Sequence, residues 1–110
     1  MEFTQEDRTT HLFPLGSIST TPGIIDLIRE GRQTATSLQK IIKRHQSGDD
    51  GVTGAEDKEA NRQALPNGTR IISAYPIDST KPSKGFGPNT IWIITEADRS
   101  CTTILLPEEY

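Results

Sequence analysis

The apolar positions of this chain are concentrated in its last third, in two runs with the composition of β-strands. Residues 90–95 and 101–106 are rich in β-branched side chains, and the polar segment 96–100 separates them. A third strand is predicted over 69–77, because apolar and polar side chains alternate there. Three successive strands joined in this way predict a three-stranded antiparallel meander.

Helical spacing precedes these strands. A first helix is predicted after Thr20-Thr21-Pro22, because a hydroxyl cap followed by proline is typical of a helix start, and Gly31 is placed to end it. A second helix is predicted from Thr36, which forms a capping box with Gln39. Its apolar face comprises Leu38, Ile41, Ile42 and His45.

A third helix is predicted over 55–65, opened by a capping box of Thr53 and Glu56. It contains few apolar residues, so we expect it to lie on the surface. The segment 78–89 holds prolines, glycines and charges, and it is predicted to be a long, mobile loop.

Helices followed by strands predict an α+β fold, in which two to three N-terminal helices pack on the C-terminal meander. The segment 11–19 adds at most an edge strand, because Pro14 cannot donate to a sheet ladder. Residues 1–10 are polar and aperiodic, and they are predicted to form a flexible tail. A single domain is expected over 11–110, which is close to the commonest domain size.

Composition narrows the function classes. The net charge of −3 argues against strong non-specific attraction to nucleic acid, although a local basic patch could still bind it. A single cysteine, Cys101, excludes an internal disulfide and fits a reducing cytoplasm. No apolar run reaches the length of a membrane span, and no motif predicts a cofactor. We therefore expect a cytoplasmic protein without a membrane partner.

Five residues are candidates for catalysis. His45 is either a core histidine bonded to a carbonyl or a general acid or base. Arg70 and Arg99 stand at strand ends, where they either form structural ion pairs or hold a phosphate. In the second case Thr103 or Tyr75 would orient that phosphate.

Five acidic residues are candidates for binding. Asp49 and Asp50 belong to a glycine-rich loop, and Glu56, Asp57 and Glu59 follow in the third predicted helix. The loop lacks the ligand spacing of a calcium-binding EF-hand, so no metal site is predicted. An exposed acidic surface would mimic the phosphates of a nucleic acid and bind a basic protein site.

The tail of the chain also carries a family resemblance. Residues 91–110 read IWIITEADRSCTTILLPEEY, and the segments 45–49, 56–61 and 70–75 contribute further matches. Together they resemble an uncharacterised family of small single-domain proteins carried by bacterial plasmids, integrative elements and phage-derived islands. The resemblance covers about residues 15–110.

Two features depart from the family's pattern. Asp50 stands where an aromatic residue usually follows Gly48-Asp49, and the segment 78–89 replaces what is usually a short turn. The first departure weakens the hypothesis that the acidic loop binds a ligand through an aromatic contact. The second makes the segment 78–89 a poor place to look for a shared site.

The resemblance implies an accessory role on a mobile element, and three hypotheses follow. The first is a non-catalytic interaction or counter-defence factor that binds a host or element-encoded protein. The second is a metal-independent endoribonuclease of the toxin type, because ribonucleases of the barnase and colicin type also place helices before an antiparallel sheet. The third is a small structural or regulatory domain without an active site. Neither the oligomeric state nor the identity of a partner follows from the sequence.

Overall fold

The computed structural model of the protein describes residues 12–110, without the side chains of residues 66 and 67. The tail predicted for residues 1–10 therefore lies outside the described residues. The chain forms helices and strands in the order β1 (Ser17–Thr20), α2 (Pro22–Arg29), α3 (Ala35–Gln46), α4 (Ala55–Asn67), β2 (Ile71–Pro76), β3 (Thr90–Thr95), β4 (Cys101–Leu105) and the 3₁₀-helix η1 (Pro107–Glu109). The predicted α+β class is confirmed.

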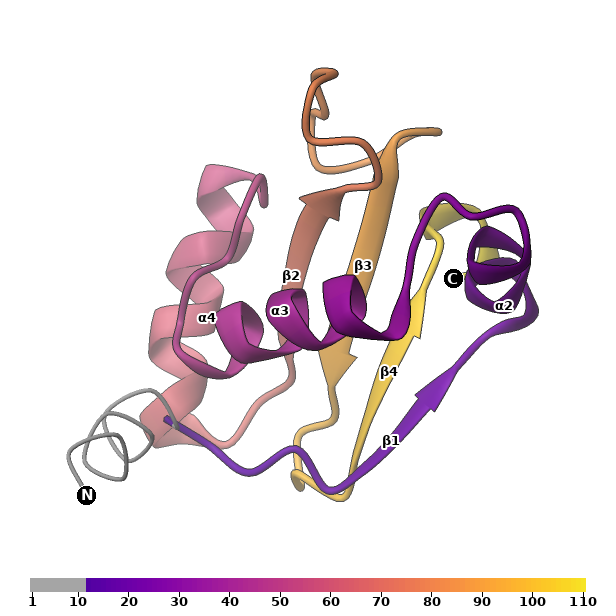
Figure 1. Cartoon of the computed structure of the whole chain (residues 1–110). Helices are drawn as coiled ribbons and strands as arrows, with labels where there is room; N and C mark the ends of the chain where they lie inside the picture. Colours follow the sequence, from indigo (N-terminus) through magenta and orange to yellow (C-terminus); the bar gives the residue numbers. More distant parts are fainter. Residues whose placement is uncertain (1–11) are drawn as a thin grey trace, which may run out of the picture.

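The sheet has four strands in the order β1-β4-β3-β2 (Figure 1). The pairs β2–β3 and β3–β4 are antiparallel, but β1 pairs with β4 in parallel. The predicted meander of three antiparallel strands and the N-terminal edge strand are therefore present, but the sheet as a whole is mixed, because the edge strand pairs in parallel. The parallel pair is sterically accessible because three helices and two strands lie between β1 and β4 and supply the long crossover that parallel strands need.

The main core lies between one face of the sheet and the helices α2 and α3. Alternation along the strands directs one set of side chains to this face. The buried members of the cluster are Ile24, Leu27, Leu38, Tyr75, Ile77, Ile91, Ile93 and Ile104. The helix α4 lies beside β2 at one edge of the sheet (Figure 1).

The helix α3 is capped differently from the prediction. Thr34, and not Thr36, is the N-cap residue, and its side chain accepts a hydrogen bond from the backbone N–H of Ser37. The Ser37 hydroxyl accepts in return from the Thr34 N–H at 2.8 Å. The predicted Gln39 partner is therefore wrong, because Ser37 occupies the third helical position once the helix begins two residues earlier.

The cap predicted for α4 is also wrong. Gly54 is the N-cap residue of α4 and provides no side-chain cap. The Thr53 hydroxyl instead donates to the Asp50 carbonyl at 2.6 Å and accepts from the Ala74 N–H at 2.9 Å. Thr53 thereby fastens the acidic loop to β2.

Hydrogen bonds from several side chains cross the connection between β2 and β3, which was predicted to be a long, mobile loop. Asn89 accepts from the Asp78 N–H at 2.9 Å and donates to the carbonyls of Asp78, Lys81 and Pro82, each at 3.2 Å. Trp92 adds a bond from its indole N–H to the Gly85 carbonyl at 2.8 Å. These bonds give the loop a defined shape.

The end of the described chain caps the first helix. Glu109 accepts hydrogen bonds from the Thr21 hydroxyl, from the Gly23 N–H at 2.9 Å and from the Leu106 N–H at 2.9 Å. Although partial burial opposes the effect, these bonds lower the pKa of Glu109. The carboxylate satisfies a free N–H at the start of α2, which the predicted threonine cap does not.

We expect Glu109→Gln to lower the free energy of unfolding by about 1 kcal/mol at pH 7, because an amide lacks the charge that strengthens these bonds. Urea unfolding measures the change. Glu108→Gln is the matched control, since Glu108 is the exposed neighbouring carboxylate. Equal losses in both variants would contradict the capping role of Glu109.

Candidate functional site

His45 stands at the centre of a buried chain of hydrogen bonds. Its Nδ1 bonds with the Ser73 hydroxyl, and its Nε2 lies 2.8 Å from the Thr95 hydroxyl. The Thr95 and Thr102 hydroxyls are 2.7 Å apart, and Thr102 donates to the Leu15 carbonyl at 2.7 Å. His45 is 1% exposed.

The last hydrogen bond of this series, from Thr102 to Leu15, determines the tautomer of the His45 imidazole. The Thr102 hydroxyl donates its only proton to the Leu15 carbonyl, so in its bond with Thr95 it must be the acceptor. Thr95 must then accept from Nε2–H of His45, which leaves Nδ1 to accept from Ser73. Each hydroxyl proton of the chain is therefore committed to a partner inside the fold.

The environment keeps His45 neutral. Burial, and to a smaller extent the positive charge of Arg99, lower the pKa of His45 to about 4. At neutral pH the ring is uncharged, and both nitrogens are engaged inside the protein. The ring contributes to the lining of a cavity of about 50 Å³ beside Phe13, but both of its nitrogens are already bonded to Ser73 and Thr95. A general acid or base must reach the proton of its substrate, so catalysis by His45 would require one of these bonds to break.

Arg99 is committed to the backbone. Its guanidinium donates to the carbonyls of Thr69 at 2.7 Å, Ala64 at 3.0 Å, Glu96 at 3.1 Å and Ala97 at 3.3 Å. These bonds tie the β3–β4 turn to the last turn of α4. Arg99 has φ 62°, a left-handed conformation that is uncommon outside glycine. An ion pair was the simplest expectation for this residue, but carbonyl groups are the partners it uses.

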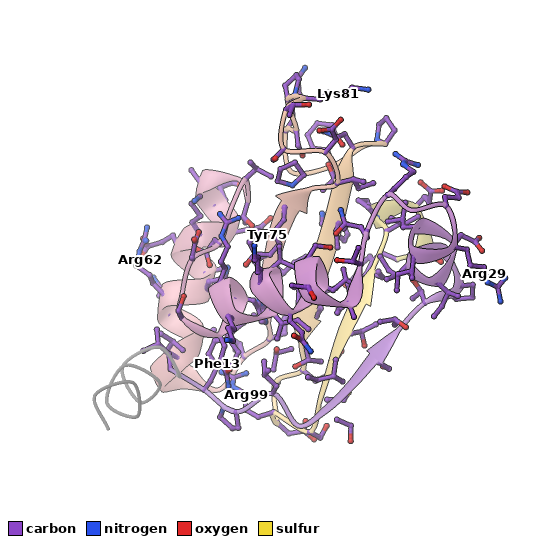
Figure 2. All side chains as sticks on the ribbon, viewed as in Figure 1. Phe13, Arg29, Arg62, Tyr75, Lys81 and Arg99 are labelled. Carbon is purple, nitrogen blue, oxygen red and sulfur yellow. The ribbon has the colours of Figure 1, made fainter. Side chains whose placement is uncertain are left out.

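An aromatic ring lies between Arg99 and the histidine. The Phe13 ring meets the His45 ring edge-on at 5.3 Å, and the Arg99 guanidinium lies 5.7 Å from the centre of the Phe13 ring (Figure 2). Phe13 is itself buried. The Phe13 ring therefore packs against both groups of the ribonuclease hypothesis.

The other three catalytic candidates are dispersed. Tyr75 is fully buried under α3, its hydroxyl donates to the Asp49 carbonyl at 2.6 Å, and burial raises the pKa of that hydroxyl (Figure 2). Arg70 donates to the Tyr110 hydroxyl at 2.8 Å. Thr103 faces the opposite side of the sheet from Thr102, as alternation requires. The structure does not bring the five candidates to one surface.

The acidic loop is largely used inside the fold. Asp49 forms an ion pair with Arg44 at 2.8 Å, and the hydrogen bond from Arg44 lowers the pKa of Asp49. Asp50 is 9% exposed and accepts from the Asn61 amide at 3.1 Å, while burial raises its pKa. Asp50 is therefore buried inside the fold, contrary to the expected acidic surface, whereas Asp49 stays exposed with its charge paired to Arg44.

Three acids of α4 do face solvent. Glu56, Asp57 and Glu59 are exposed in the first two turns of the helix. Glu59 forms an ion pair with Arg62 at 3.3 Å, and both partners are more than half exposed. These three residues are called the α4 acids below, and the basic residues Lys58 and Arg62 lie among them on the same helix.

Asp57, one of the α4 acids, lines a pocket that the sequence did not reveal. The pocket has a volume of about 130 Å³, and Asp57, Arg70, Trp92 and Tyr110 contribute to its lining. The Trp92 and Tyr110 rings meet at 5.6 Å in an edge-on arrangement, and the Arg70 guanidinium lies 5.6 Å from the centre of the Tyr110 ring. We call Arg70, Trp92 and Tyr110 the aromatic cluster. Only the mixed character of Trp92, apolar with one N–H donor, hinted at a surface role.

A wider cavity of about 630 Å³ opens between the α2–α3 turn and the β2–β3 loop. Its lining carries both signs of charge, with Arg32 and Lys81 near Asp78. Arg32 also lies 3.7 Å from Glu30, an exposed pair. The mixed charges and exposed walls do not select one class of ligand.

Two negative findings apply to residues 12–110. No three His, Cys, Asp or Glu side chains in this part of the chain come close enough together to hold a metal ion. The helices described there are too short or too polar to cross a membrane. Comparison with known proteins adds no assignment, because no family model, curated protein or solved structure matches the chain.

Proposed function

We propose that this protein is a non-catalytic interaction protein, which binds a basic surface of a host or element-encoded protein. The observation that supports this proposal most directly is the continuity of the α4 acids with the aromatic cluster. Asp57 lines the same pocket as Arg70, Trp92 and Tyr110, so charge and aromatic area adjoin on one surface.

The residue types of this surface suit protein recognition. Tryptophan, tyrosine and arginine are enriched among the residues that dominate binding energy in protein interfaces. Tyr110 is 72% exposed, so its ring offers apolar area to a partner. A pocket of about 130 Å³ accommodates a single side chain and not a larger ligand.

The charges indicate the character of the partner. Glu56 and Asp57 lie in the first turn of α4, and Glu59 follows within a turn. Surfaces of this sign attract basic protein sites and accelerate their association. The resemblance of the tail to proteins of plasmids and phage islands suggests a mobile-element setting. A factor that blocks a basic nuclease of the host defence would be one such role.

Pull-down from a bacterial host lysate, with the tagged full chain as bait, tests the proposal. We expect a partner whose retention falls as salt rises, because the screening length shrinks from about 10 Å at 0.1 M to about 3 Å at 1 M. Double-stranded DNA added as competitor should displace this partner if its bound surface is a nucleic-acid site. Glu56→Lys/Asp57→Lys should reduce retention about tenfold or more.

The matched control is Asp26→Lys/Glu30→Lys, which makes the same change of charge on α2, at the other side of the molecule (Figure 1). This control should retain the partner. Tyr110→Ala should weaken retention without lowering the melting temperature, since Tyr110 is mostly exposed. Equal retention by the α4 and α2 reversals would contradict the proposed surface.

A further inference from the structure

One edge of the sheet is open. On its inner side β1 pairs with β4, with hydrogen bonds from the Ser17 N–H to the Ser100 carbonyl at 3.0 Å and from the Thr21 N–H to the Ile104 carbonyl at 3.2 Å. Alternation then turns the backbone N–H and C=O of the even-numbered residues of β1 outward. All four residues of β1 are exposed, and within residues 12–110 no segment pairs with this outer side (Figure 1).

The opposite edge is closed. The Val52 N–H donates to the Ala74 carbonyl at 2.8 Å, and Gly51 forms a bridge with the same residue of β2. The Asn61 side chain occupies the next position, where it accepts from the Ile72 N–H at 3.0 Å and donates to the Ile72 carbonyl. A Cβ at Gly51 would lie 2.1 Å from the Ala74 carbonyl oxygen, so the chain approaches this edge as closely as glycine allows.

β1 carries no charge, proline or bulge of its own, and its shortness, at four residues, is the one usual protection that this edge has. Natural edge strands carry charges, prolines or bulges that prevent pairing with another chain. β1 reads Ser-Ile-Ser-Thr, and the whole stretch 12–25 lacks a charged residue in a chain that is 25% charged. Ile18 is 49% exposed on this strand.

We propose that β1 pairs with β1 of a second copy of this chain, in a two-fold symmetric antiparallel dimer. A neutral edge brings no like charges together, although each copy carries a net charge of −3. The closed edge at β2 prevents further addition, so assembly stops at two copies and does not continue into a fibre.

The backbone also selects a register. Gly16 has φ 65° and ends the extended stretch, so only Ile18 and Thr20 present outward groups within β1. All outward N–H and C=O groups of these two residues find a partner when Ile18 of one copy lies opposite Thr20 of the other. Ser19 then lies opposite its own counterpart, at a non-hydrogen-bonded position on the two-fold axis. Because the strand is short, the interface is smaller than the roughly 1,200–2,000 Å² of stable complexes, and the dimer is a weak one.

Sedimentation velocity on the full chain, from about 10 µM to about 1 mM, tests the dimer. We expect the dimer fraction to rise with concentration, and Ile18→Lys to weaken association about tenfold or more. Ile28→Lys is the matched control, since Ile28 is an exposed isoleucine on α2. A monomer throughout the range, or equal weakening by both variants, would overturn the proposal.

Disulfide trapping tests the register, in a Cys101→Ser background that removes the native thiol. Ser19→Cys should cross-link, because directly opposed Cα atoms at such positions lie about 4.5 Å apart, which suits a disulfide. Ser17→Cys should not, since four residues of offset separate the two sulfurs by about 13 Å. Equal cross-linking of the two variants would indicate random collision and contradict the paired strand. The variants leave the α4 acids intact, so the result does not depend on the proposed function.

Discussion

Acidification from pH 7 to pH 4 should lower the stability of this protein by roughly 3 kcal/mol through His45 alone. The folded-state pKa of about 4 lies below the ordinary value of 6.5, so the unfolded chain takes up the proton first. The stabilisation that comes from the neutral His45 is complete above about pH 6.5 and is lost as the pH falls toward 4. Urea unfolding at several pH values gives the free energies.

His45→Gln isolates this effect from the titration of carboxylates. The variant should be less stable at pH 7, because Ser73 and Thr95 lose well-placed partners in the core. The variant has no histidine to protonate at this position. The difference in unfolding free energy between the two proteins should therefore narrow by roughly 3 kcal/mol from pH 7 to pH 4. A gap that stays constant from pH 7 to pH 4 would show that His45 titrates normally.

Replacement of Arg99 by alanine should cost about 3 kcal/mol of unfolding free energy. The variant loses the bonds to carbonyls of α4 and of the β3–β4 turn, and it still places a side chain at φ 62°. Arg99→Gly should recover about 1 kcal/mol of that loss, because glycine adopts positive φ without strain. Thermal and urea unfolding of both variants provide the comparison.

Arg62→Ala is the control for the loss of an arginine. Arg62 is exposed and forms a single ion pair along its own helix, so its removal should cost no more than about 0.5 kcal/mol. An Arg99→Ala variant as stable as Arg62→Ala, or more stable than Arg99→Gly, would show that the carbonyl bonds contribute little.

Local patterns predicted most of the secondary structure. The run of β-branched residues defines β3 at its observed bounds, Thr90–Thr95. The helical spacing of Leu38, Ile41, Ile42 and His45 predicted α3 and the face that it buries. These features depend on neighbours within one or two turns, which is the range over which periodicity carries information.

The errors have two sources, near-equivalent local choices and partners distant in the sequence. Thr34 and Thr36 are both good caps with a suitable residue three positions later, so local chemistry does not choose between them. The burial of Asp50 depends on Asn61 of the following helix. Aspartates in loops are usually exposed, and the sequence alone does not show when tertiary packing buries one of them.

The candidate site follows the same division. The sequence identified His45 and Arg99 as candidates, but His45 is a fixed part of the interior and the half-buried Arg99 is bonded to the backbone. Their partners are hydroxyls and carbonyls from other elements, which composition does not reveal. The pocket at Asp57 and Trp92 likewise joins α4 to β3 and to the end of the described chain.

Because Asn89 closes the base of the β2–β3 hairpin, the length of the loop above it does not decide whether the sheet stays paired. The Ile77 N–H pairs with the Asn89 carbonyl at 3.2 Å, so the hairpin is closed below the loop. The ladder beneath the loop can accordingly keep its register when residues 79–88 change, although a shorter loop would lose the bonds of Asn89 to Lys81 and Pro82 and of Trp92 to Gly85. This hairpin is therefore a place where evolution, or an engineer, can insert new sequence without a compensating change in the core.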